Sequence, residues 1–154
     1  PYQFDRDRKT WCWDKKITDS DLDFVVRGRP EVTDTEPIEV AVRVSLSAKI
    51  RFDETEAVTG ILPIVFDIET HHPDVMWLTH PAQITAFMKI FRGVLRDIRN
   101  LAPNCKCIHL FFAGPTGCAV VAGQAINPRM YPPVQLYEYD RNQAQRYSAV
   151  LKLS

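Results

Sequence analysis

Apolar side chains recur along this chain with two different periods, and together the two periods predict an α/β fold. Short apolar runs rich in β-branched and aromatic residues fall at 38–50, 61–68, 107–112 and 134–139. Runs of this kind are typical of strands. Residues 79–101 instead repeat apolar side chains at spacings of three and four, the period of an amphipathic helix. Strands alternating with helices indicate a mostly parallel sheet.

Residues 105–140 form the unit around which we expect the fold to be organised. The run ending at Phe112 is cut by the turn Gly114–Gly117 and followed by small residues suited to a closely packed helix, before the run at 134–139 begins. A connection of this length is no hairpin, so the two strands are predicted to lie parallel in one sheet. The turn then lies at the carboxyl end of the first strand. Open α/β sheets bind ligands there, and a helix start offers free N–H groups to an anion.

The composition predicts one globular domain with a single core. The chain has 154 residues, of which 45% are hydrophobic and 25% charged. Residues 1–36 are polar and charge-dense and predict only short strands or a hairpin, whereas residues 37–154 carry the strands and helices. The predicted fold is α/β and Rossmann-like, with a mostly parallel sheet flanked by helices. Because the sequence starts at Pro1 rather than Met, we expect a fragment of a longer protein.

Charge is balanced overall but divided between the two halves of the chain. Residues 1–79 hold ten Lys and Arg against sixteen Asp and Glu, a local charge of −6, and residues 80–154 hold nine against three, a local charge of +6. A positive half suits a phosphate-bearing partner, although a solvated helix face explains most of these charges as well. The basic residues of the predicted helix, Lys89, Arg92, Arg96 and Arg99, fall mostly off its apolar stripe.

The cysteines and the absence of targeting patterns predict a reduced, cytoplasmic protein. Cys107 and Cys118 stand in apolar runs where packed thiols are expected, and Cys105 is too close to Cys107 for a good zinc half-site. No signal peptide or membrane-length apolar run is present. We therefore expect no metal, no cofactor and no membrane partner.

The candidate ligand-binding residues all lie at or just after the carboxyl ends of predicted strands. Ser47 and Lys49 fall near the carboxyl end of the strand at 38–50, and Thr70 and His71 stand in the polar loop after the strand at 61–68. The remaining candidates are the turn residues Gly114, Pro115, Thr116 and Gly117. Hydroxyls, an ammonium group, an imidazole and free N–H groups suit a ligand that carries phosphates and bases. Each residue is also compatible with an ordinary loop, and only their convergence on one edge points to a site.

The order of these blocks resembles the SAVED domain, the sensor module of CBASS antiphage effectors. The resemblance rests on Ser45-Leu46-Ser47-Ala48 near the end of the first strand and on the block His109–Pro115, with supporting matches at Ala119, Gly123 and Leu136-Tyr137. It covers residues 38–154, and its strongest part is the His-Leu-Phe block.

This resemblance implies two fused CARF-like lobes, of which the chain holds mainly the second. It implies binding of a cyclic di-, tri- or tetranucleotide made by a partner nucleotidyltransferase (CD-NTase). Binding would drive self-association and activate an attached nuclease, TIR or protease domain, none of which is identifiable in the chain. The expected activity is therefore sensing without catalysis.

Two other functions stay open from the sequence. A CARF-like ring nuclease would degrade its cyclic ligand, with His71 or Lys49 assisting attack by a ribose hydroxyl. A structural or assembly domain would use the glycine turn only for packing. A dinucleotide-cofactor enzyme is disfavoured because the chain has neither a Gly-x-Gly-x-x-Gly motif after a strand nor a Walker phosphate loop.

Overall fold

A computed structural model describes residues 3–5, 10–12, 17–28 and 38–154. Four of the predicted strands and the long predicted helix are found close to their expected positions. In chain order the elements are β1 (Gln3–Asp5), β2 (Thr10–Cys12), the 3₁₀ helix η1 (Asp19–Leu22), β3 (Phe24–Arg27), β4 (Glu39–Ser45), α1 (Phe52–Thr59), β5 (Ile64–Thr70), α2 (Pro81–Leu101), β6 (Cys107–Ala113), α3 (Thr116–Ala125), β7 (Val134–Tyr139) and β8 (Tyr147–Leu153).

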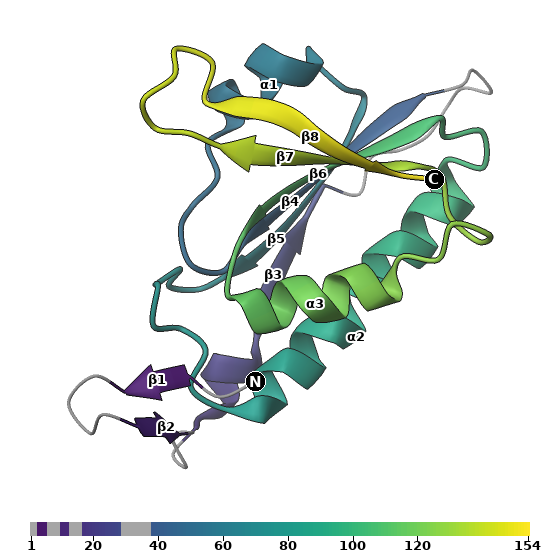
Figure 1. The fold of residues 1–154 in the computed structure, drawn as a ribbon. Helices are drawn as coiled ribbons and strands as arrows, with labels where there is room; N and C mark the ends of the chain where they lie inside the picture. Colours follow the sequence, from purple (N-terminus) through teal and green to yellow (C-terminus); the bar gives the residue numbers. More distant parts are fainter. Residues whose placement is uncertain (1–2, 6–9, 13–16, 29–37) are drawn as a thin grey trace.

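Six strands form one sheet in the order β3-β5-β4-β6-β7-β8 (Figure 1). The four central strands β5, β4, β6 and β7 are parallel, whereas the edge strands β3 and β8 are antiparallel to their neighbours. This confirms the predicted α/β class and the parallel β6-α3-β7 unit. The sheet also includes β3, which lies in the polar segment 1–36 where only short strands or a hairpin were predicted. Strands β1 and β2 pair antiparallel as a separate ribbon.

The helices cover the two faces of the sheet unequally (Figure 1). Alternate residues of β4, such as Val40 and Val42, point into the large core beneath α2 and α3, which includes the fully buried rings of Phe66 and Phe87. A smaller cluster on the α1 face contains Ala41, Ile50, Phe111 and Tyr147. Burial of large rings on both faces makes the sheet the rigid frame from which the connecting loops project.

The start of α2 is built by a buried glutamine. Gln83 accepts backbone hydrogen bonds from Thr79 and His80, both at 2.8 Å, and donates to the carbonyl of Trp77 at 3.0 Å. His80 caps the helix by accepting from the Ala82 N–H. This network fixes the end of the segment between β5 and α2 to the first turn of the helix.

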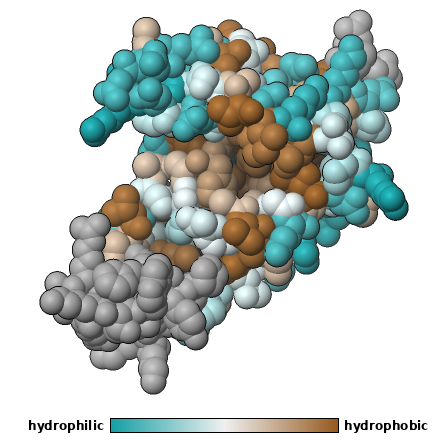
Figure 2. All heavy atoms as spheres, in the orientation of Figure 1, coloured by the Kyte–Doolittle hydropathy of each residue, from teal (hydrophilic) through white to brown (hydrophobic). Residues whose placement is uncertain are grey.

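The surface carries an exposed apolar area. Figure 2 shows apolar residues gathered in the middle of this view, between the β7–β8 hairpin and α3. These elements carry exposed large apolar side chains, including Val120 of α3 and Val150 and Leu151 of β8. Exposed apolar groups that gather in one place are typical of interaction surfaces.

Candidate functional site

The carboxyl ends of the parallel strands meet at one edge of the sheet, and two of the segments that follow them are bonded together. The N–H groups of Leu46 and Ser47 both donate to the carbonyl oxygen of Ala113, the last residue of β6, at 2.8 and 2.9 Å. The loop after β4 is therefore fixed beside the turn that begins at Gly114. Ser47 and the turn 114–117, which are far apart in the sequence, lie together at this edge.

Gly114 is required by packing at the turn. A β-carbon at this position would lie 2.9 Å from a ring carbon of Phe112 and 3.1 Å from a methyl carbon of Leu46. Pro115 follows in extended conformation and supplies the carbonyl that accepts from the N–H groups of Cys118 and Ala119, the start of α3. The turn thus directs the chain from the sheet straight into the helix.

The amino end of α3 keeps free hydrogen-bond donors. Within the described part of the chain, no side chain caps this helix. The first N–H groups of a helix have no intrahelical acceptor, so those of Thr116 and Gly117 can bind an anion. Thr116 is exposed, whereas Gly117 is buried. The edge offers backbone donors at the place where the sequence predicted them.

Strand β4 is shorter than the predicted 38–50, and the reason is local. It ends at Ser45, whose buried hydroxyl accepts from the N–H of Ile50 at 3.1 Å. This bond turns the chain back so that Ile50 packs into the small cluster, and residues 46–49 form a tight loop. Ser45 has a structural role, while the exposed side chain of Lys49 stands 3.8 Å from Glu69 of β5.

Thr70 is the last residue of β5, and the prediction of a loop at this position was wrong. The strand continues to Thr70 because it pairs antiparallel with Phe24 of β3. Its side chain is buried, and its Oγ1 atom has no hydrogen-bond partner among the described residues. A buried hydroxyl without a partner is uncommon in proteins and is often satisfied by a water or ligand.

His71 follows Thr70 but is directed toward β3. Its Nε2 atom lies 3.3 Å from the carboxylate of Asp23, and both side chains are exposed. Strand β4 separates β5 from β6, so the ends of β5 and β6 are about 10 Å apart. Thr70 and His71 therefore lie next to the loop after β4 that contains Ser47, but one strand away from the turn 114–117.

A tyrosine at the same edge was missed from the sequence. Tyr139 ends β7, which is parallel to β6, and its ring is half-exposed and lies 5.1 Å from the ring of Tyr147, edge to face. It borders a hollow of about 520 Å³ in the β7–β8 loop that is also lined by Gln143 and Gln145. The ring offers a face for stacking a base. Its position at the end of a predicted parallel strand could have identified it.

The cations on the α1 face of this edge are mostly paired. Arg43 makes a bidentate salt bridge to Asp67 at 2.6 and 2.8 Å, and Arg51 makes one to Asp53 at 3.1 and 2.8 Å. Lys49 is held more loosely by its single contact. Of these three cations, Lys49 gives up the weakest salt bridge when its side chain turns toward an incoming phosphate.

The described thiols are unsuited to nucleophilic catalysis. Burial raises the pKa of Cys118 to about 12 and that of Cys105 to about 11, and it also raises the pKa of Cys107. These thiols are protonated near neutral pH and therefore weak nucleophiles. Within the described ranges, no group of three or more His, Cys, Asp or Glu side chains is arranged to hold a metal ion.

Comparison with known proteins decides the family. The sequence matches the SAVED family, described as "SMODS-associated and fused to various effectors sensor domain", over residues 1–153. The chain belongs to the SAVED family. The resemblance seen in the His109–Pro115 block is thereby confirmed, and the match extends through the polar segment that precedes it. No match is found among curated protein sequences.

Solved structures show the same fold at low sequence identity. The SAVED domain described here superposes on the Acinetobacter baumannii Cap4 SAVED/CARF-domain containing receptor with the cyclic trinucleotide 2′3′3′-cAAA, with a TM-score of 0.65 and 18% identity over 84% of this chain and 27% of that chain. The receptor with 3′3′3′-cAAA gives a TM-score of 0.62 and 16% identity over 82% of this chain and 27% of that chain. The receptor described without a ligand gives a TM-score of 0.59 and 19% identity over 84% of this chain and 25% of that chain. The chain thus spans about a quarter of the Cap4 chains it matches.

Proposed function

We propose that this SAVED domain binds a cyclic oligonucleotide, most readily a cyclic trinucleotide, at the carboxyl edge of its sheet and performs no chemistry on it. The observation that carries the proposal is the bonding of Ser47 to Ala113, which places a hydroxyl beside the uncapped start of α3. The two Cap4 receptor structures named with cAAA support the ligand class.

The edge has the chemistry that such a ligand requires. One phosphate would accept from the N–H groups of Thr116 and Gly117, and the side chain of Lys49 could release Glu69 to reach a second. The ring of Tyr139 would stack on a base, and the hydroxyl of Thr70 would gain the partner that it lacks in the described structure. These groups spread over the ends of four neighbouring strands, an extent that suits a ring of several nucleotides better than a mononucleotide.

The signalling role follows from the family rather than from this chain alone. SAVED domains are described as sensors fused to various effectors. We propose that a CD-NTase supplies the ligand, and that binding promotes self-association and activates an attached effector domain. The exposed apolar residues on α3 and β8 support a role in association.

Three free thiols support the proposal of a reducing, cytoplasmic compartment. Within the described ranges, no helix is long and apolar enough to cross a membrane.

The ring-nuclease alternative is less well supported. A general base must reach the ribose hydroxyl that it activates. His71 is engaged by Asp23 on the β3 side, and the described thiols are protonated. The residues beside the turn, Ser47 and Thr116, have no neighbouring histidine or carboxylate contact in the described structure that would activate them.

One experiment separates binding from degradation. The chain is incubated with 2′3′3′-cAAA, 3′3′3′-cAAA or linear triadenylate, and each mixture is divided between a thermal-melting measurement and chromatography of the nucleotides. We expect a cyclic ligand to raise the melting temperature, because a ligand that binds only the folded state stabilises that state. We also expect the ligand to be recovered intact, since the proposed function includes no catalysis. Linear products would establish the nuclease instead, and an unchanged melting temperature with every cyclic ligand would leave the structural-domain function.

A further inference from the structure

The outer surface of α2 carries a row of cations that the proposed ligand site does not use. The row consists of Lys89, Arg92, Arg96 and Arg99, which follow one another at spacings of three, four and three residues. Residues at these spacings share one side of a helix. All four are exposed, on the side of the helix away from the buried rings of Phe87 and Phe91. We call these four residues the α2 basic stripe.

The stripe has no acidic partner in the described structure. None of its members forms a salt bridge with a described carboxylate, and the single acidic residue of α2, Asp97, lies off the stripe and is partly buried. From Lys89 to Arg99 the stripe is about 15 Å long at 1.5 Å per residue. Four unneutralised cations over this length create a local positive field that attracts a polyanion.

A glycine stands in the helix beside the stripe without a packing reason. Gly93 lies in the middle of α2, where glycine is less favourable than alanine because it loses more conformational freedom on folding. A β-carbon at Gly93 would meet nothing within 4 Å, so the fold does not exclude a side chain there. A residue that is unfavourable for the helix and unnecessary for its packing fits a surface that another molecule approaches closely.

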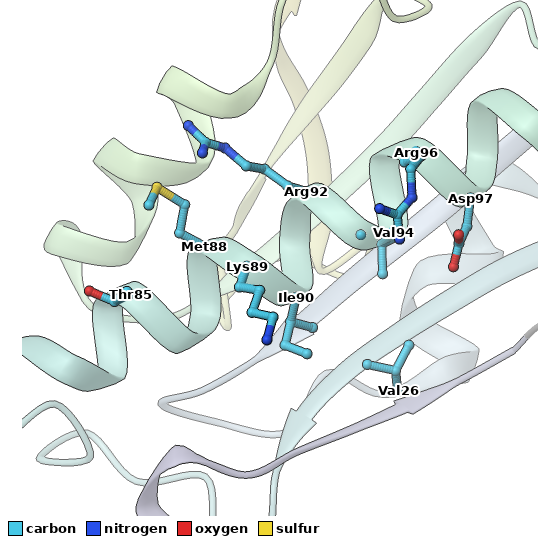
Figure 3. Close-up of a pocket in the computed structure, with 10 residues that line it drawn as sticks. Val26, Thr85, Met88, Lys89, Ile90, Arg92, Val94, Arg96 and Asp97 are labelled. Carbon is cyan, nitrogen blue, oxygen red and sulfur yellow. The ribbon is translucent and has the colours of Figure 1, made fainter.

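The surface around Gly93 is hollowed. A cavity of about 530 Å³ lies against the outer side of α2, and its lining includes three cations (Lys89, Arg92 and Arg96), one carboxylate (Asp97) and the apolar residues Ile90 and Val26. Figure 3 shows these side chains along the helix, with Val26 contributed by the neighbouring strand β3. The guanidinium groups therefore border a recess rather than stand on a flat surface.

We propose that the α2 basic stripe binds the phosphate backbone of double-stranded nucleic acid without reading its sequence. A stripe of about 15 Å faces about nine phosphate charges of a duplex, at one per 1.7 Å of axis. Three of its four cations are arginines, whose planar forks pair with phosphate oxygens. An acidic protein surface fits less well, because the cores of protein interfaces are depleted of charged residues, whereas all four exposed members of the stripe are charged. This partner and surface are separate from the cyclic ligand and its edge.

The test is the salt dependence of duplex binding. The whole chain is titrated into a labelled duplex of random sequence, about 20 base pairs long, at several salt concentrations between about 50 and about 200 mM, and binding is followed by fluorescence anisotropy. With four phosphates neutralised, the logarithm of affinity should fall with the logarithm of salt at a slope of about −3.6, a loss of about 150-fold over this range. Duplexes of different sequence should bind equally.

Two double variants with the same change of net charge locate the surface. Arg92→Glu with Arg96→Glu should reduce the magnitude of the slope by at least about 2 and weaken binding more than tenfold at the lowest salt. Arg129→Glu with Lys152→Glu, at exposed positions outside α2, should leave the slope unchanged. Circular dichroism melting verifies that both variants fold, and both should retain the response to cyclic triadenylate, so failure here leaves the proposed sensor function untouched.

Three results would overturn the proposal. The first is no duplex binding by the unmodified chain at the lowest salt. The second is an equal loss of binding in both double variants, which would show a general charge effect. The third is a stripe variant that binds duplex normally but loses self-association in sedimentation velocity, which would assign the stripe to a contact between copies of the chain.

Discussion

The N–H of Ser47 donates to the carbonyl oxygen of Ala113 at 2.9 Å, so the loop after β4 is attached to the end of β6. Both strands belong to the parallel centre of the sheet, and this bond brings their following segments into one rim. The rim combines the hydroxyl of Ser47 with the free N–H groups at the start of α3. The sensor function proposed for the domain depends on this junction.

Reversal of charge at Lys49 should weaken binding of cyclic triadenylate. Lys49 is exposed and loosely paired with Glu69, so Lys49→Glu removes an attraction for phosphate and adds a repulsion without disturbing the core. We expect about a tenfold higher dissociation constant by isothermal titration calorimetry, which corresponds to about 1.4 kcal/mol. The matched control is Lys106→Glu, because Lys106 is exposed at the amino end of β6, on the opposite edge of the sheet. Equal loss in both variants would argue against a site at the carboxyl edge.

A side chain at position 114 should destabilise the turn. Gly114→Val places methyl groups where even a β-carbon is 2.9 Å from Phe112, so either the ring or the loop at Leu46 must move. Overpacking of this kind costs about 1–3 kcal/mol in the free energy of unfolding, measurable by urea denaturation. Gly123→Val is the comparison, because it makes the same glycine-to-valine change at a position where a β-carbon would meet nothing within 4 Å. A Gly114→Val variant as stable as that comparison would contradict the packing argument.

The buried salt bridge between Arg43 and Asp67 should show the asymmetry expected of buried charges. The Arg43 side chain is 5% exposed, so Asp67→Ala leaves an uncompensated guanidinium and should lower the free energy of unfolding by about 3 kcal/mol. The double variant Arg43→Met with Asp67→Leu removes both charges at similar volume and should recover much of that loss. The residual hydrogen bond from Arg43 to Thr55 and the contact with the ring of Phe52 do not replace the carboxylate. A double variant no more stable than Asp67→Ala would contradict this account.

Alkaline pH should destabilise the domain. Burial raises the pKa of the Cys118 thiol from 9.0 to about 12, and that of the Tyr147 hydroxyl from 10.0 to about 12. The folded state therefore favours the neutral forms, whose contribution to stability is complete below about pH 9 and is lost progressively as the pH rises toward 12. Urea denaturation between about pH 8 and about pH 11 should show this decline. The decline should be shallower in Tyr147→Phe than in the unmodified chain, and identical slopes would exclude a contribution from Tyr147.

Much of the fold was predictable because periodicity reports burial directly. The continuous apolar runs of β5 and β6 and the three-and-four spacing in α2 each identify the element that buries those residues. The end of β4 was not predictable, because it is set by the hydroxyl of Ser45 binding the N–H of Ile50, a contact without a periodic signal. The extension of β5 to Thr70 depends likewise on pairing with β3.

The site was predictable only in part. Strand ends and the glycine turn are visible in the sequence, so Ser47 and Gly114–Gly117 could be placed on one edge. The sequence could not show that His71 turns toward β3 and lies one strand away from the turn 114–117, because the order of strands in the sheet decides which strand ends are neighbours. Tyr139 was missed since a tyrosine at the end of an apolar run is ordinary in a strand; its position at a strand end was visible in the sequence, but the exposure of its ring was not.

The most direct measurement is a map of the backbone amides that respond to cyclic triadenylate, by two-dimensional ¹H–¹⁵N NMR of the labelled chain during titration with 2′3′3′-cAAA. The account predicts the largest changes at Ser47, Lys49, Thr116 and Gly117, with the amide of Lys106 at the opposite edge unchanged. Changes confined to other surfaces, with the amides of Ser47 and Thr116 unmoved at saturation, would contradict it.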